Sequence, residues 1–218
     1  MPFGFGRKKE ESASPPDLGP AVAAADSPGP RRVPLHAFTE EWRLRGMVVI
    51  EGRLLEALNG REALSIEDAQ WAPADGSSPL EPAPGIQAMD PYDLIFVIAT
   101  PDTLAAVTGE ERVAHHVHKI PFDVAIESPP YRLIGTIQLR PGTDPDSLLQ
   151  RSLPMFSAVT DARVTLNGAP LELAADADAV LVNRYYVRGV EEVDKTTGRP
   201  HLRFPGQSSG GEDRTAPD

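Results

Sequence analysis

One phrase occurs twice in this chain, about ninety residues apart, and it constrains the fold more than any other feature. Residues 43–52 read RLRGMVVIEG and residues 132–142 read RLIGTIQLRPG, each preceded by an aromatic residue, Trp42 or Tyr131. Four further matches keep the same order in both halves: VPL (33–35) with IPF (120–122), LLEALN (54–59) with LLQRSL (148–153), DAQW (68–71) with DARV (161–164), and SPLE (78–81) with APLE (169–172). Such an ordered series predicts an internal duplication.

Alternation within the repeated phrase predicts a half-buried strand in each copy. The residues expected on the apolar face are Trp42, Leu44, Gly46, Val48 and Ile50 in the first copy, and Tyr131, Leu133, Gly135, Ile137 and Leu139 in the second. A glycine stands at the same place in both apolar rows. It predicts a close backbone approach where the sheet curls.

The predicted fold class is mainly β, with two tandem homologous modules, each a small curved sheet or barrel, short helices and disordered termini. Further strands are expected near 63–72, 92–99, 156–166 and 179–187, and helical segments at 53–60, 100–109 and 144–153. The predicted boundaries are a disordered arm at 1–30, a first module at 31–100, a connector at 101–117, a second module at 118–194 and a disordered tail at 195–218. Both terminal segments are rich in Pro, Ser and Gly and lack an apolar period.

Composition narrows the possible environments and partners. The chain has no cysteine and a net charge of −11, which is carried by residues 31–194. An acidic surface disfavours nucleic-acid binding and adhesion to anionic lipid. No apolar run approaches the roughly 18 residues of a membrane helix, and the amino terminus lacks the apolar stretch of a signal peptide. We therefore expect a cytoplasmic protein without membrane insertion.

Motifs for catalysis or cofactor binding do not occur, so the sequence assigns no catalytic, cofactor-binding or metal residue. It contains no GxSxG, no GxxxxGK[ST] and no GxGxxG after a strand. His115, His116 and His118 form the densest ligand-like cluster, which suits either a metal or a solvated edge strand. Acidic residues at 90–93 and 176–178 favour turns over a cation site.

Six arginines stand before or within the repeated strands: Arg31, Arg32, Arg43, Arg45, Arg132 and Arg140. We expect them on the solvent face, where they cover apolar surface and pair with acids. Recognition of an anion or a partner is the alternative.

The segment GRLLEALN at 52–59, after an apolar strand with a central glycine, resembles a group of small bacterial β-domains of unknown function. The resemblance covers about seventy residues of the first copy; the second copy keeps the leucine pair but lacks the Arg-Leu start and the asparagine. It implies a small curved β-fold. Arginines ahead of a small barrel also resemble PilZ domains, which bind cyclic dinucleotides, but the RxxxR spacing and the [D/N]xSxxG motif are missing here.

The function expected from these features is a non-enzymatic, cytoplasmic interaction or assembly module that presents sheet edges or faces to a protein partner. The segment 113–119 is the candidate edge strand. Two alternatives stay open. One is a sensor of an anionic small molecule that uses Arg31, Arg32, Arg43 or Arg132, and the other is an enzyme of a class that the sequence does not disclose.

Overall fold

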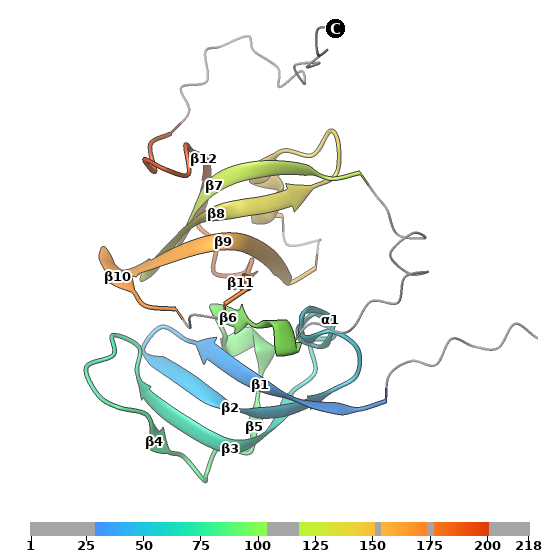
Figure 1. Cartoon of the computed structure of the whole chain (residues 1–218), viewed down its shortest axis with the longest axis vertical. Helices are drawn as coiled ribbons and strands as arrows, with labels where there is room; N and C mark the ends of the chain where they lie inside the picture. Colours follow the sequence, from blue (N-terminus) through green and yellow to red (C-terminus); the bar gives the residue numbers. More distant parts are fainter. Residues whose placement is uncertain (1–28, 104–117, 151–153, 174–176, 201–218) are drawn as a thin grey trace, which may run out of the picture.

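The computed structural model describes residues 29–103, 118–150, 154–173 and 177–200. They form a mainly β fold, as predicted, with one antiparallel sheet of twelve strands (Figure 1). The first half of the chain contributes β1 (Arg31–Phe38), β2 (Trp42–Ile50), β3 (Leu64–Pro73), β4 (Glu81–Pro82), β5 (Ala88–Met89) and β6 (Phe96–Ala99). The second half contributes β7 (Ile120–Ser128), β8 (Tyr131–Leu139), β9 (Phe156–Leu166), β10 (Ala169–Leu171), β11 (Ala179–Asn183) and β12 (Gly189–Glu192).

Helical structure is short. It consists of the helix α1 (Leu54–Asn59) and the 3₁₀ turns η1 (Pro91–Asp93), η2 (Pro101–Thr103) and η3 (Pro145–Leu149). Within the described segments, no helix has the length and apolar character needed to cross a membrane.

The two halves of the chain meet at the centre of the sheet, where β6 pairs with β11. The strand order is β12-β7-β8-β9-β11-β6-β1-β2-β3-β4, with β10 beside β9 and β5 beside β3. Every residue of β6 and β11 is buried, because the sheet carries one hydrophobic core on each face of these strands. Val97 and Leu181 enter the first core, and Ile98 and Val180 enter the second.

The two repeated strands have the same register toward their neighbours. Leu35 of β1 lies opposite Gly46, and Val124 of β7 lies opposite Gly135. A β-bulge follows at the same place in both halves, between Arg45 and Met47 in β2 and between Ile134 and Thr136 in β8. On the facing strands, Asp68 and Asp161 have positive φ angles of 53° and 49°.

Close packing around both glycines confirms the predicted backbone approach. A Cβ atom on Gly46 would lie 2.6 Å from the Ile66 side chain and 2.9 Å from the Glu67 carbonyl oxygen. On Gly135 it would lie 2.7 Å from the Val159 side chain and 2.8 Å from the carbonyl oxygen of Thr160. Any larger residue would therefore push the neighbouring strand away.

The last two strands of each half also have matching neighbours. β5 pairs with β3 and β6 with β1, whereas β11 pairs with β9 and β12 with β7. A turn separates the two strands in each case. It is fixed by Asp90, whose side chain accepts from the Tyr92 amide at 2.9 Å, and by Asn183, which accepts from the Tyr185 amide at 3.0 Å.

Some segments differ from the sequence-based expectations. In the described residues, the helical segments expected at 100–109 and 144–153 are the 3₁₀ turns η2 and η3. Residues 195–200, expected to belong to a disordered tail, form a turn closed by a bridge between Val193 and Pro200. The arm at 1–28, the tail beyond residue 200 and most of the expected edge strand, 113–117, lie outside the described residues.

Candidate ligand-binding site

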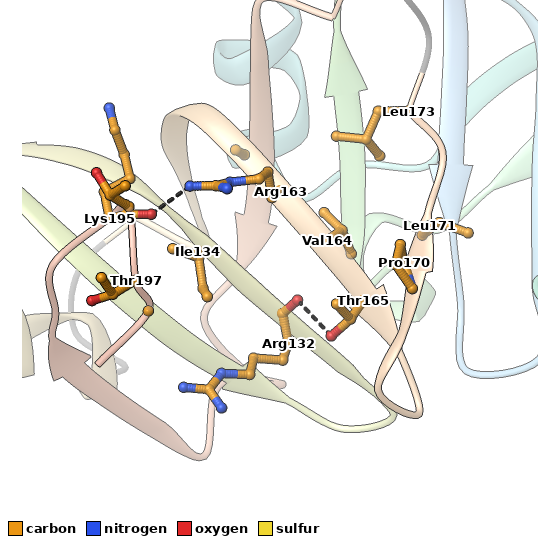
Figure 2. A pocket seen from close by; sticks show the side chains of 13 residues that line it. Arg132, Ile134, Arg163, Val164, Thr165, Pro170, Leu171, Leu173, Lys195 and Thr197 are labelled. Carbon is orange, nitrogen blue, oxygen red and sulfur yellow. Dashed lines mark hydrogen bonds between the residues drawn. The ribbon is translucent and has the colours of Figure 1, made fainter. Parts of the chain in front are cut away.

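A pocket of about 430 Å³ lies on the second half of the sheet, between β8, β9, β10 and the turn that follows β12 (Figure 2). Its cationic lining residues are Arg132, Arg163 and Lys195. Its apolar lining includes Ile134, Leu171 and Leu173. This volume and this mixture of apolar wall and few charged groups are typical of small-ligand sites.

Strand register brings the two arginines of the pocket to one face. Arg132 lies opposite Thr165 and Ile134 lies opposite Arg163 in the pairing of β8 with β9. Directly opposite residues in antiparallel strands have their side chains on the same face of the sheet. The Thr165 hydroxyl also donates to the Arg132 carbonyl oxygen at 3.5 Å (Figure 2).

The turn after β12 closes one side of the pocket. The Asp194 carboxylate accepts hydrogen bonds from the amides of Thr196 and Thr197, both at 2.8 Å, and its carbonyl oxygen accepts from the Gly198 amide at 2.7 Å. Gly198 has a φ of +67°, and a Cβ atom there would lie 3.1 Å from the Ile134 side chain. Glycine thus lets the turn fold onto β8.

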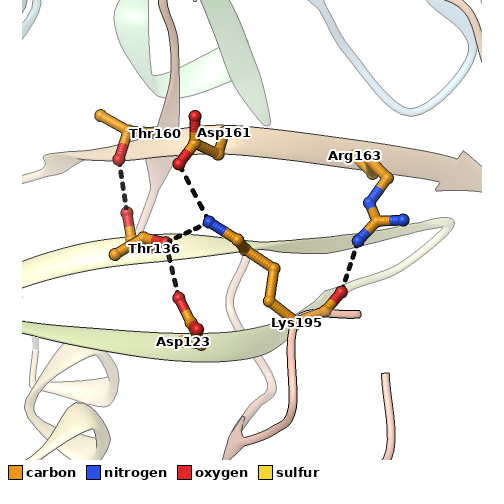
Figure 3. Close-up of polar contacts among 6 residues, drawn as sticks. All are labelled: Asp123, Thr136, Thr160, Asp161, Arg163 and Lys195. Atoms are coloured by element: carbon orange, nitrogen blue, oxygen red, sulfur yellow. Dashed lines mark hydrogen bonds and ion pairs between the residues drawn. The ribbon is translucent and has the colours of Figure 1, made fainter. Parts of the chain in front are cut away.

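A polar network ties this turn to the sheet (Figure 3). The Lys195 ammonium donates to the Asp161 carboxylate at 2.9 Å and to the Thr136 hydroxyl at 3.1 Å. The Thr136 hydroxyl donates to Asp123 at 2.6 Å, and Arg163 donates to the Lys195 carbonyl oxygen. Lys195 is therefore chiefly an anchor for the turn, and Arg163 is held at the rim of the pocket.

Two of the three cations that line the pocket have a carboxylate partner. Arg132 Nε lies 3.1 Å from Glu127, and Lys195 lies 2.9 Å from Asp161. No ion pair within the described part of the chain engages Arg163. The carboxylates of Asp123, Glu127, Asp161 and Asp194 lie beside the pocket, but the charged residues that line it are all cationic, and it is these cations that favour an anionic ligand.

The pocket is lined by hydroxyl and cationic groups. Among the described residues, the hydroxyls that line it belong to Thr165, Thr196 and Thr197, and no lining residue is a histidine, cysteine or carboxylate. A threonine nucleophile needs an adjacent general base.

The other arginines singled out in the sequence do not line this pocket. Arg31 donates to the carbonyl oxygens of Gly52, Asp102 and Thr103 at 2.8–3.2 Å. Arg32 lies 2.6 Å from Glu67. These contacts serve the structure of the first half.

On the repeated strands, only one of the remaining arginines belongs to the pocket. Arg43 donates to the Ser78 carbonyl oxygen at 2.8 Å, and Arg45 and Arg140 are exposed. Of Arg31, Arg32, Arg43 and Arg132, any of which the sensor alternative could use, Arg132 lines the pocket.

Arg163 and Lys195 were missed by reasoning from the sequence. Arg163 could have been found by extending the alternation along 156–166, which places it on the outer face of β9. Lys195 carries no such signal, because it lies in the polar turn DKTTGRP.

A metal site has no support in the described residues. His118 is exposed, and His115 and His116 lie outside the described residues. In the segments that the structure describes, no three His, Cys, Asp or Glu side chains converge as metal ligands would.

In comparisons with known proteins, no family, no curated protein and no solved structure matches this chain. The functional argument therefore rests on the chemistry of the site.

Proposed function

We propose that this chain is a non-enzymatic interaction module that binds an anionic group in the pocket between β8, β9, β10 and the turn after β12. The observation that carries the proposal is the position of Arg163 and Arg132 on one face of the sheet beside an apolar wall. The molecule is otherwise acidic, with a net charge of −11. A local cationic pocket on such a surface concentrates anions at one place.

The ligand would combine a carboxylate or phosphate with an apolar portion. A guanidinium group offers paired donors that match either anion. Ile134, Leu171 and Leu173 would contact the apolar portion. The anion can belong to a protein partner, as in the assembly hypothesis, or to a free small molecule, as in the sensor hypothesis.

We also propose that the two halves are duplicated, barrel-like units. Two observations support this: the bulges after Gly46 and Gly135 coincide, and each last strand pairs with the first strand of its own half. Small β units of this kind present binding sites on their outer faces.

Titration with two probes tests the binding proposal and separates the two sources of the anion. One probe is adenosine monophosphate, and the other is a short synthetic peptide with one phenylalanine between two glutamates. We expect at least one probe to bind by isothermal titration calorimetry, more weakly as salt rises. Arg163→Gln should weaken that binding about tenfold or more. The matched control is Arg140→Gln, because Arg140 is exposed outside the pocket.

Three outcomes would contradict the proposal. Neither probe binds the natural chain, Arg163→Gln binds as well as the control, or the chain chemically converts a probe. The last result would favour the enzyme alternative.

A further inference from the structure

Two tryptophans form an exposed stacked pair on the first half of the sheet. Trp42 begins β2 and Trp71 lies on β3, with ring centroids 4.6 Å apart and planes inclined by 18°. Their exposed fractions are 38% and 40%. A stacked pair of exposed tryptophans forms a continuous apolar patch, and tryptophan is enriched at the centres of protein interfaces.

The corresponding places in the second half are buried. Trp42 corresponds to Tyr131, because each of them directly precedes the repeated phrase. Trp71 corresponds to Val164, because Trp71 lies opposite Leu44 and Val164 lies opposite the equivalent leucine, Leu133. Tyr131 and Val164 are only 1% and 2% exposed. The two halves therefore differ in what covers this part of the sheet.

Residues of the first half cover Tyr131. The rings of Phe96 and Phe38 approach it edge-on, with centroid distances of 5.0 and 6.2 Å. The Tyr131 hydroxyl donates to the Thr39 carbonyl oxygen at 2.8 Å. In the second half, the residue at this position of the repeated strand, Tyr131, is therefore covered by aromatic side chains of the first half.

We propose that the face formed by Trp42 and Trp71 binds a protein partner through a segment with an apolar or aromatic side chain flanked by basic residues. The anchor side chain would contact the tryptophan rings as Phe96 contacts Tyr131. This docking face lies on the first half of the sheet, so the inference is independent of the pocket on the second half.

Acidic residues next to the two tryptophans favour a partner segment in which basic residues flank the anchor side chain. Glu81 lies directly opposite Trp71. Glu41 directly precedes Trp42, and Asp75 follows the end of β3. The backbone joins these two segments, because the Glu41 carbonyl oxygen accepts from the Ala74 amide at 2.8 Å. All three carboxylates are exposed, and no ion pair in the described residues engages them. Hydrogen bonds from Ser77 and, to a smaller extent, the nearby charge of Arg43 lower the pKa of Asp75. Arginine beside these groups gains both a carboxylate partner and a cation–π contact.

A second copy of the chain fits this face poorly. The residues that correspond to Phe38 and Phe96 in the second half are Glu127 and Gly189, which lie opposite each other as the phenylalanines do. A second copy that docked here in the same way would therefore place the Glu127 carboxylate where Phe38 contacts Tyr131 between the two halves. Its net charge of −11 would add repulsion.

Intrinsic fluorescence tests the inference directly, since Trp42 and Trp71 are the two tryptophans of the chain. The probe is a heptapeptide with a central phenylalanine between two pairs of arginines. We expect a saturable change in tryptophan emission when it is titrated up to about 1 mM. A peptide with alanine in place of phenylalanine should bind at least about tenfold more weakly.

Variants of the chain locate the contact. Trp71→Ala and Glu81→Lys should each weaken binding of the heptapeptide about tenfold, with far-ultraviolet circular dichroism unchanged. Glu62→Lys is the control for Glu81→Lys, because Glu62 is also exposed and the change in net charge is identical.

The proposal is overturned if no saturable change occurs, if the alanine peptide binds equally well, or if both lysine variants bind alike. Sedimentation adds one more decisive result. Self-association of the natural chain that Trp71→Ala abolishes would make a second copy the occupant and would also overturn the proposal.

Discussion

Two glycines set how closely the strands approach at the bulges. At Gly46 and Gly135 a Cβ atom would lie within 2.7 Å of a side chain and within 2.9 Å of a carbonyl oxygen of the facing strand. A side chain there cannot be accommodated by moving one flexible group, because backbone atoms are among the contacts.

Gly46→Val and Gly135→Val should therefore each lower the free energy of unfolding by about 1–3 kcal/mol through overpacking. Urea denaturation measures this change. Gly85→Val is the control, since a Cβ atom on Gly85 meets nothing within 4 Å. Equal stability of Gly135→Val and the control would show that β8 and β9 are not this close.

His36 makes stability depend on pH. Burial, followed by the charges of Arg45 and Arg43, lowers the pKa of His36 from 6.5 to about 4. Between these pH values the unfolded chain binds a proton that the folded chain does not. The contribution of His36 to the free energy of unfolding is thus fully present above pH 6.5 and is lost as the pH falls toward 4.

His36→Gln should flatten this part of the pH dependence. Urea denaturation at about pH 7.5 and about pH 4.5 measures it, and His118→Gln is the control because His118 is exposed. An equal loss of stability on acidification in His36→Gln and in the natural chain would contradict the assignment.

Among the elements, the turn after β12 is attached to the sheet by the Lys195 side chain and by the hydrogen bond from Arg163 to the Lys195 carbonyl oxygen. Lys195→Met would remove the hydrogen bonds to Asp161 and Thr136. We expect faster amide hydrogen exchange at residues 196–198, corresponding to about 1 kcal/mol less protection. Lys119→Met, at an exposed position, is the control. Unchanged exchange in Lys195→Met would mean that the Asp194 and Arg163 hydrogen bonds alone hold the turn.

Strands were easier to predict from the sequence than the pocket. The alternation around Gly46 and Gly135 gives β2 and β8 directly, because each strand has one buried face. The pocket combines Arg132 with Arg163 and Lys195, which are 31 and 63 residues further along the chain. Their meeting depends on long-range register and on a turn whose residues show no periodicity. The alternation also placed Trp42 on the apolar face of β2. It could not show that Trp42 is exposed, because that depends on which other segments pack against this face.

In the whole molecule, two side-chain amides join the halves, that of the buried Asn183 and that of the partly buried Asn59. The fully buried Asn183 side chain donates to the carbonyl oxygens of Leu94 at 2.8 Å and Pro91 at 3.3 Å. Asn59 of α1 accepts from the Phe156 amide at 2.7 Å and donates to its carbonyl oxygen at 3.3 Å. Together with the β6–β11 pairing, these contacts make the two cores one cooperative unit.

Asn183→Ala should lower the free energy of unfolding by about 2–3 kcal/mol, because it leaves two buried carbonyl groups without this donor. Calorimetry should still show one transition, shifted to lower temperature. Gln138→Ala, an exposed amide on β8, is the control. Two separate transitions in the natural chain would contradict the coupling of the halves.

We propose that the second half of the sheet binds an anion and that the first half, which has the same strand register, does not. Nuclear magnetic resonance titration of the labelled chain with adenosine monophosphate and the glutamate peptide tests it most directly. The account predicts that the responding amides are those of Ile134, Arg163 and residues 195–198, while their first-half counterparts at Arg45 and Gln70 stay unchanged. Equal responses in both halves, or none at Arg163 with either probe, would contradict it.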